Sequence, residues 1–141
     1  MGKASSYEWI RIGGSYLLSD VLASLVYTQF KKIEIIHKKR RRIALWYINE
    51  LNDLKKNIWF PSLQIEKETN WHTFAICVPG SYQMSIISEL KKRGIGAAFH
   101  YLPLHSSFYG KKLGYKKSDL PITNEVSSTL IRLPIYPSLT K

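Results

Sequence analysis

The sequence has one cysteine, few acidic residues and no long apolar run, and each shortage excludes a class of protein. Its single cysteine, Cys77, cannot form an internal disulfide, which excludes a disulfide-stabilised secreted domain. No apolar run approaches the roughly 20 residues that span a bilayer, and the N-terminus lacks the pattern of a secretion signal. Because Cys77 lies in an alternating apolar run, we interpret it as a buried reduced thiol in a cytoplasmic protein that has no membrane partner.

The shortage of acidic residues, 10 against 21 lysines and arginines, leaves a formal net charge of +11. Such a charge suits nucleic acid or another polyanion. A solvated basic face, or one half of a larger protein whose other half is acidic, explains it as well. The aromatic residues lie in apolar strands rather than among the basic residues, unlike a single-strand-binding surface. A basic nucleic-acid-binding or regulatory module therefore stays as the alternative interpretation.

The composition, with 45% hydrophobic and 22% charged residues over 141 positions, is typical of one globular domain with a modest core. A single cysteine rules out a Cys/His zinc set of the usual spacing, and we expect no metal. The run Gly94-Ile95-Gly96 follows a predicted helix and precedes a predicted strand, which is the reverse of the order in a dinucleotide-binding loop.

One long amphipathic helix is predicted first, beginning after an N-cap at Ser19 or Asp20 and running to about Leu51. Its apolar residues recur every three or four positions, and Lys38-Lys39-Arg40-Arg41-Arg42 is woven into the pattern. The basic run could bind phosphates, but a solvated or subunit-facing helix surface fits the pattern better. Arg40 falls on the apolar stripe, where it is a candidate to pair with a carboxylate or a ligand.

Shorter elements follow. Residues 72–78 and 95–101 read as strands, and Phe74, Ile76 and Val78 lie on one face of the first. Before the first strand we expect a loop over residues 52–68 with a short strand near 58–60. Two helices are predicted, one capped by Ser81 and ended by Gly94, the other capped by Thr123 or Asn124. A loop over 106–120 precedes the second helix, and an extended segment over 132–136 follows it. The order α-β-α-β-α-β predicts an α/β (α+β) fold, with a small mixed sheet packed against helices after one long N-terminal helix.

Two segments are candidates for a site. Residues 12–20 form a turn of small polar groups before a helix, a geometry that suits a phosphate. His100 and His105 flank a proline turn at a strand end, where binding residues gather. His37 is interpreted as a surface residue of the helix and His72 as a hydrogen-bonded structural residue.

Five blocks, in order along the chain, resemble the sugar-nucleotide aminotransferases of the DegT/DnrJ/EryC1/StrS family, above all the dTDP-4-amino-4,6-dideoxygalactose transaminase branch. They are similar to the branch's "YxW…GSSYLPSD", "QL…R", "NxHxFY", "HYxPLH" and "LLRLPLY". In this sequence they are Tyr7-Glu8-Trp9 with residues 12–20, Gln29 with Arg41 or Arg42, Asn70-x-His72 with Phe74, residues 100–105, and residues 130–136.

The resemblance implies a fold-type-I pyridoxal-phosphate enzyme that works as a homodimer. It implies amination of dTDP-4-keto-6-deoxyglucose to dTDP-4-amino-4,6-dideoxygalactose, with glutamate as the amino donor, for cell-surface polysaccharide biosynthesis. Residues 1–18 would be an interdomain, cofactor-facing segment, and residues 19–141 the small C-terminal domain, incomplete at its C-terminus.

The same resemblance assigns roles to residues. Ser15, where most of the family has an asparagine, and Tyr16, which could also simply pack, would bind the cofactor phosphate of the neighbouring subunit. His100, Tyr101 and His105 would bind the dTDP-sugar. The family's Schiff-base lysine segment, "TKN…GEGG", has no counterpart here, so we expect no catalytic residue in this chain, pyridoxal phosphate held mainly by a missing large domain, and no activity of the chain alone. A chain without any stable function is the third possibility, because an exposed apolar helix face favours aggregation.

Overall fold

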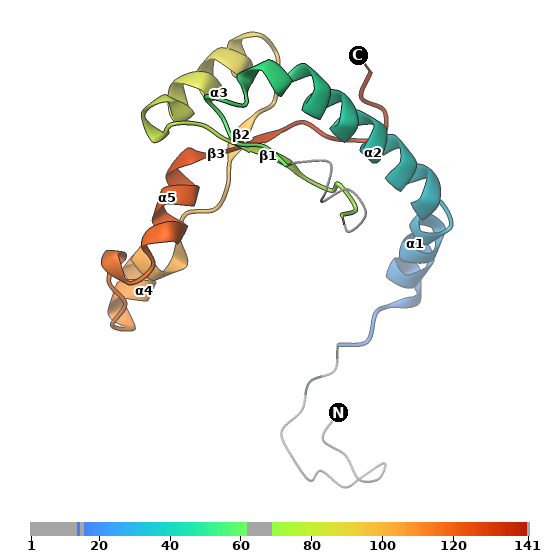
Figure 1. The fold of residues 1–141 in the computed structure, drawn as a ribbon. Coiled ribbons are helices and arrows are strands. Elements are labelled where there is room, and N and C mark those ends of the chain that lie inside the picture. Colours follow the sequence, from blue (N-terminus) through green and yellow to red (C-terminus); the bar gives the residue numbers. More distant parts are fainter. Residues whose placement is uncertain (1–13, 15, 62–68, 141) are drawn as a thin grey trace, which may run out of the picture. The chain divides into compact units, whose positions relative to one another are not determined.

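The computed structural model describes residues 14, 16–61 and 69–140 of the chain, which divides into two compact units, residues 1–34 and 35–141 (Figure 1). The predicted combination of helices with a small sheet is confirmed. Its helices and strands are, in chain order, α1 (Asp20–Phe30), α2 (Ile33–Glu50), β1 (Phe74–Cys77), α3 (Gln83–Lys92), β2 (Ala98–Phe99), α4 (Phe108–Lys112), α5 (Pro121–Thr129) and β3 (Leu130–Leu133).

The first unit holds α1, whose predicted cap is confirmed: the Ser19 side chain accepts a hydrogen bond from the backbone N–H of Leu22. None of the residues of α1 is buried. The prediction of one continuous helix is wrong, because a turn at Lys31 and Lys32 separates α1 from α2. There the N–H of Lys32 donates to the carbonyl of Gln29, three residues back, so the helical ladder tightens although no proline or glycine is present.

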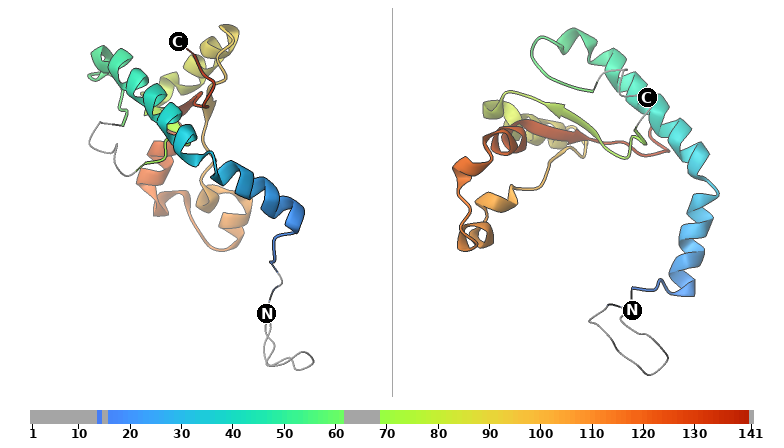
Figure 2. Two further views of the ribbon diagram at one scale, coloured as in Figure 1. Left: turned by 90° about the vertical axis from the view of Figure 1, so that its right-hand side faces the viewer. Right: turned by 60° about the horizontal axis from the view of Figure 1, so that its bottom comes forward.

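The core of the second unit lies on one face of the sheet. Phe74, Ile76 and Ile131 of the strands are buried there against Ala44 and Ile48 of α2. Ile86 and Ile87 of α3 pack against the same cluster, so α2 and α3 cover the same face (Figures 1 and 2). The predicted alternation of Phe74, Ile76 and Val78 is thereby confirmed.

The sheet has the order β1-β3-β2, and both pairings are antiparallel. The predicted strand over residues 95–101 shrinks to Ala98–Phe99, because the N–H groups of Ile95 and Ala97 bond to the carbonyl oxygens of Leu90 and Ile95 instead of to a neighbouring strand. The strand expected near residues 58–60 is a single bridge, Trp59 to Cys77. Cys77 is half-buried rather than buried.

Three boundaries also differ from expectation. Ser81 lies in a short 3₁₀ turn, Gly80–Tyr82, and does not cap α3, which begins at Gln83 without a side-chain cap. The expected loop over 106–120 contains α4. Helix α5 begins at Pro121, before Thr123 and Asn124, because the fixed φ of proline suits a first helical position. Gly94 follows the end of α3 with a φ of 77°, as predicted.

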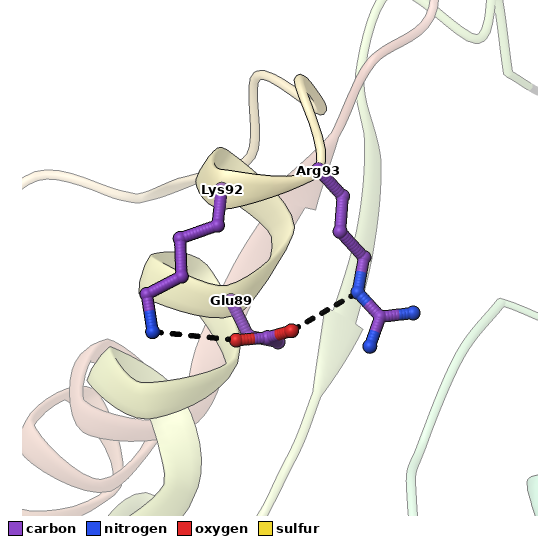
Figure 3. A network of polar contacts seen from close by, with 3 residues as sticks. All are labelled: Glu89, Lys92 and Arg93. Carbon is purple, nitrogen blue, oxygen red and sulfur yellow. Dashed lines mark hydrogen bonds and ion pairs between the residues drawn. The ribbon is translucent and has the colours of Figure 1, made fainter.

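Helix α3 is fixed at its start by a buried side chain and is solvated at its end. The Gln83 amide donates to the carbonyl oxygens of Ser127 (3.0 Å) and Leu130 (2.8 Å), which joins α3 to the junction of α5 and β3. At the other end Glu89 pairs with Lys92 (3.5 Å) and Arg93 (3.1 Å), as Figure 3 shows. Exposed pairs of this kind add little to stability.

Candidate functional site

The segment that follows β2 carries three of the predicted site residues. The rings of His100 and Tyr101 meet edge to face, 4.9 Å apart, and both side chains are exposed. The Tyr101 carbonyl oxygen accepts a hydrogen bond from the Ser127 hydroxyl of α5 (3.4 Å). Pro103 then leads into a 3₁₀ turn, Leu104–Ser106, that buries His105.

Two neighbouring clefts share Tyr101, Pro103 and Thr123. The smaller one, of about 280 Å³, is also lined by His100 and the apolar face of α5, including Ile122, Val126 and Leu130. The larger one, of about 710 Å³, runs over the segment between Pro103 and Leu120 and holds His105. The structure thus brings His100, Tyr101 and His105 together around one surface, with Tyr101 between the two clefts.

The larger cleft combines aromatic surface with a few polar groups. Tyr109 and Tyr115 join Tyr101 in its wall. His105 is 7% exposed, and its Nε2 atom has no hydrogen-bond partner among the described residues. Buried polar atoms are nearly always hydrogen-bonded in native proteins, so an unpartnered ring nitrogen beside a cleft fits a site that a ligand completes. Tyrosine rings with hydroxyl groups suit a flat, amphipathic ligand.

Positive charge gathers beside this cleft. Lys111, Lys112, Lys116 and Lys117 are all exposed on the same stretch of chain. The one acid nearby in sequence, Asp119, accepts a hydrogen bond from the backbone N–H of Lys116 (2.8 Å). The resulting positive potential favours an anionic ligand.

Close backbone packing shapes the larger cleft. Ser107 caps α4 by accepting a hydrogen bond from the Gly110 N–H (3.0 Å). A Cβ atom at Gly110 would overlap the carbonyl oxygens of Leu104 and His105, so only glycine allows α4 to approach the turn that holds His105.

The predicted cofactor residues belong to the other unit. Ser15 lies outside the described residues. Tyr16 is 97% exposed and stands just before the capped start of α1. A free phenol ahead of a helix N-terminus has the donor chemistry that a phosphate needs, so the residue present fits that group. Tyr16 thus belongs to residues 1–34, whereas His100, Tyr101 and His105 belong to residues 35–141.

Sequence reasoning missed Tyr109, Tyr115 and Thr123, which line these clefts. The two tyrosines lie in the stretch expected to be a loop, where their aromatic character was the available signal. Thr123 was interpreted as a helix cap.

The basic run of α2 is mostly exposed. Lys38, Lys39, Arg41 and Arg42 are exposed, while Arg40 is half-buried, in agreement with its place on the apolar stripe. In the parts of the chain that the structure describes, no His, Cys, Asp and Glu residues gather as a metal site would require. Over the same residues, no helix has the length and apolar character needed to cross a membrane.

Comparison with known proteins identifies the family of the chain. The profile of the DegT/DnrJ/EryC1/StrS aminotransferase family matches residues 1–141. An uncharacterized protein of Methanocaldococcus jannaschii is 37% identical over 139 residues, which are 95% of this chain and 36% of that protein.

Solved structures share the fold. DesV of S. venezuelae, in complex with a ketimine intermediate, superposes with a TM-score of 0.87 at 23% identity, over 99% of this chain and 37% of that one. The PLP form of the putative sugar aminotransferase Spr1654 from Streptococcus pneumoniae gives a TM-score of 0.82 at 25% identity, over 99% and 37%. The chain therefore spans little more than a third of the length of these proteins. From its first residue to its last, it belongs to the DegT/DnrJ/EryC1/StrS aminotransferase family.

Proposed function

We propose that this chain supplies the substrate-binding part of a pyridoxal-phosphate-dependent aminotransferase that acts on a nucleotide sugar. The observation that carries the proposal is the family match over the whole chain, which includes the segment around the two clefts. The proposed reaction moves the amino group of glutamate to dTDP-4-keto-6-deoxyglucose and forms dTDP-4-amino-4,6-dideoxygalactose for cell-surface polysaccharide, in the cytoplasm.

The larger cleft is the proposed place of the dTDP-sugar. Tyr101 and the neighbouring tyrosines offer ring faces to a base or sugar, and His105 offers its unpartnered Nε2 to a polar group of the ligand. His100 would contact the same ligand from the smaller cleft. The lysines of residues 111–117 would attract the diphosphate.

Ser15 and Tyr16 are the proposed contacts of this chain to the cofactor phosphate, across the interface of a homodimer. Pyridoxal phosphate supplies the electron sink for amino transfer. The Schiff-base lysine would come from another part of the enzyme, since the chain has no segment like the family's lysine motif. The role of this chain is then to bind and orient the sugar nucleotide.

The test begins with the genomic DNA on the 5′ side of the Met1 codon. We expect it to encode the family's lysine segment, either in frame or after a frameshift. The two segments, expressed as one polypeptide or together, are then incubated with pyridoxal phosphate, ¹⁵N-labelled L-glutamate and dTDP-4-keto-6-deoxyglucose.

Mass spectrometry of the nucleotide sugar decides the outcome. We expect a ¹⁵N-labelled amino sugar from the joined segments and none from this chain alone. A product formed only from UDP- or GDP-linked keto sugars would overturn the dTDP assignment. No labelled product from any nucleotide sugar would overturn the proposed activity.

A further inference from the structure

Arg132, in the middle of the central strand β3, lies on the sheet face opposite the core. Its cross-strand partners are Ala75 on β1 and Ala98 on β2, while the core residue Ile131 points the other way. Because both cross-strand partners are alanines, no large side chain flanks Arg132 on either neighbouring strand. A cleft of about 220 Å³ opens there, lined by Arg132 together with His72, Thr73, Gly96, Ala98, Leu133 and Ile135.

The guanidinium is held in place, but most of its N–H donors have no hydrogen-bond partner among the described residues. Its Nη2 donates to the carbonyl oxygen of Phe99 (3.3 Å), and its Nε is buried without a partner. Among residues 14, 16–61 and 69–140, no acidic side chain pairs with it, and none lines the cleft. An arginine has five N–H donors in a rigid fork that matches a carboxylate, and a buried donor without a partner is unfavourable.

A turn of unusual conformation presents His72 to the same cleft. The Asn70 side-chain oxygen accepts from the His72 N–H (3.1 Å) and lies 2.8 Å from the ring Nδ1, so these two contacts hold the imidazole in place. Between them Trp71, which is buried, has a φ of 48°, a conformation that side-chain-bearing residues adopt at a cost. The turn therefore fixes the histidine rather than letting it follow the strand.

We propose that Arg132 and His72 form a binding site for the carboxylate group of a small molecule, on the sheet face opposite the core. The cleft, of about 220 Å³, has room for a carboxylate with a short chain. One arginine fork without a lysine in the wall suits a planar carboxylate better than a phosphate, which takes more donors. Identifying this carboxylate with that of the amino donor rests on the proposed function; the binding itself does not.

The test uses the complete ¹⁵N-labelled chain and follows the Arg132 Nε–H and His72 signals by NMR during titration with L-glutamate. We expect saturable shifts of both signals, and an affinity about tenfold lower or worse in Arg132→Gln. Arg132→Lys should lie between, because an ammonium keeps the charge but loses the fork. Arg93→Gln, which removes the exposed arginine directly after α3 (Figure 3), should bind like the wild type.

Each other outcome is decisive. The absence of a saturable shift, an equal loss in Arg93→Gln, or inorganic phosphate binding at least as tightly as glutamate would overturn the site. If Arg132→Gln does not fold, wild-type affinity in Arg132→Lys would overturn it. A parallel titration with dTDP-glucose separates the two proposals: glutamate binding without dTDP-glucose binding would sink only the proposed function, and the reverse result only this inference.

Discussion

The hydroxyl of Tyr47 in α2 donates a hydrogen bond to the carbonyl oxygen of Pro134, which follows β3, at 2.8 Å. The Tyr47 ring also packs at 4.9 Å from Phe74 of β1. This one side chain thus ties the basic helix to the sheet that carries Arg132. We expect Tyr47→Phe to lower the free energy of unfolding by about 1 kcal/mol, measured by urea denaturation, because the carbonyl loses its donor.

The control is Tyr82→Phe, which removes an exposed hydroxyl that has no hydrogen-bond partner among the described residues and should change the stability by less than about 0.5 kcal/mol. Equal losses in the two variants would mean that the bond to Pro134 adds nothing.

Alkaline pH should weaken the same contact. Burial, and to a smaller extent the charge of Tyr136, raises the pKa of the Tyr47 hydroxyl above its ordinary value of 10.0. The unfolded chain therefore loses this proton first, so the stabilisation is complete below pH 10.0 and is lost as pH rises through the folded-state pKa. In unfolding titrations from about pH 9 to 11, the stability difference between wild type and Tyr47→Phe should shrink. A difference that stays constant across that range would contradict the assignment.

Replacement of Gly110 should damage the larger cleft. Alanine is the better helix former, by about 1 kcal/mol, yet its Cβ would overlap the carbonyl oxygens of Leu104 and His105. We expect Gly110→Ala to lower the free energy of unfolding by roughly 1–3 kcal/mol. Gly96→Ala, whose Cβ would meet nothing within 4 Å, is the control and should fold with nearly unchanged stability. A Gly110→Ala protein as stable as the wild type would show that α4 can move away from the His105 turn.

The buried amide of Gln83 should be costly to remove. It satisfies two carbonyl oxygens, those of Ser127 and Leu130, and Gln83→Leu leaves both without a donor. We expect a loss of about 1–3 kcal/mol in unfolding free energy. The exposed glutamine of α1 provides the comparison, since Gln29→Leu should change the free energy of unfolding by less than about 0.5 kcal/mol. An equally small effect of Gln83→Leu would show that water replaces the amide.

Sequence periodicity predicted the elements whose apolar residues repeat, and missed features set by local hydrogen bonds. The buried positions of β1 and the cap at Ser19 followed from alternation and capping chemistry. The break at Lys31 and Lys32 carries no proline or glycine signal, and α4 is too short for a period to appear in the sequence.

For the site, the pattern around Pro103 indicated His100 and His105, the family resemblance added Tyr101, and the fold gathers the three around one surface. Nothing in one sequence shows that Ala75 and Ala98 flank Arg132, because that register arises only when three distant strands pair.

The most direct test of the account is a titration of the ¹⁵N-labelled chain with dTDP-glucose, followed by NMR with residue-level assignment. The account predicts saturable shifts confined to the walls of the two clefts, including Tyr101 and His105, and a weaker response in His105→Ala. Equal binding of dTDP-glucose by His105→Ala, or shifts that avoid both clefts, would contradict it.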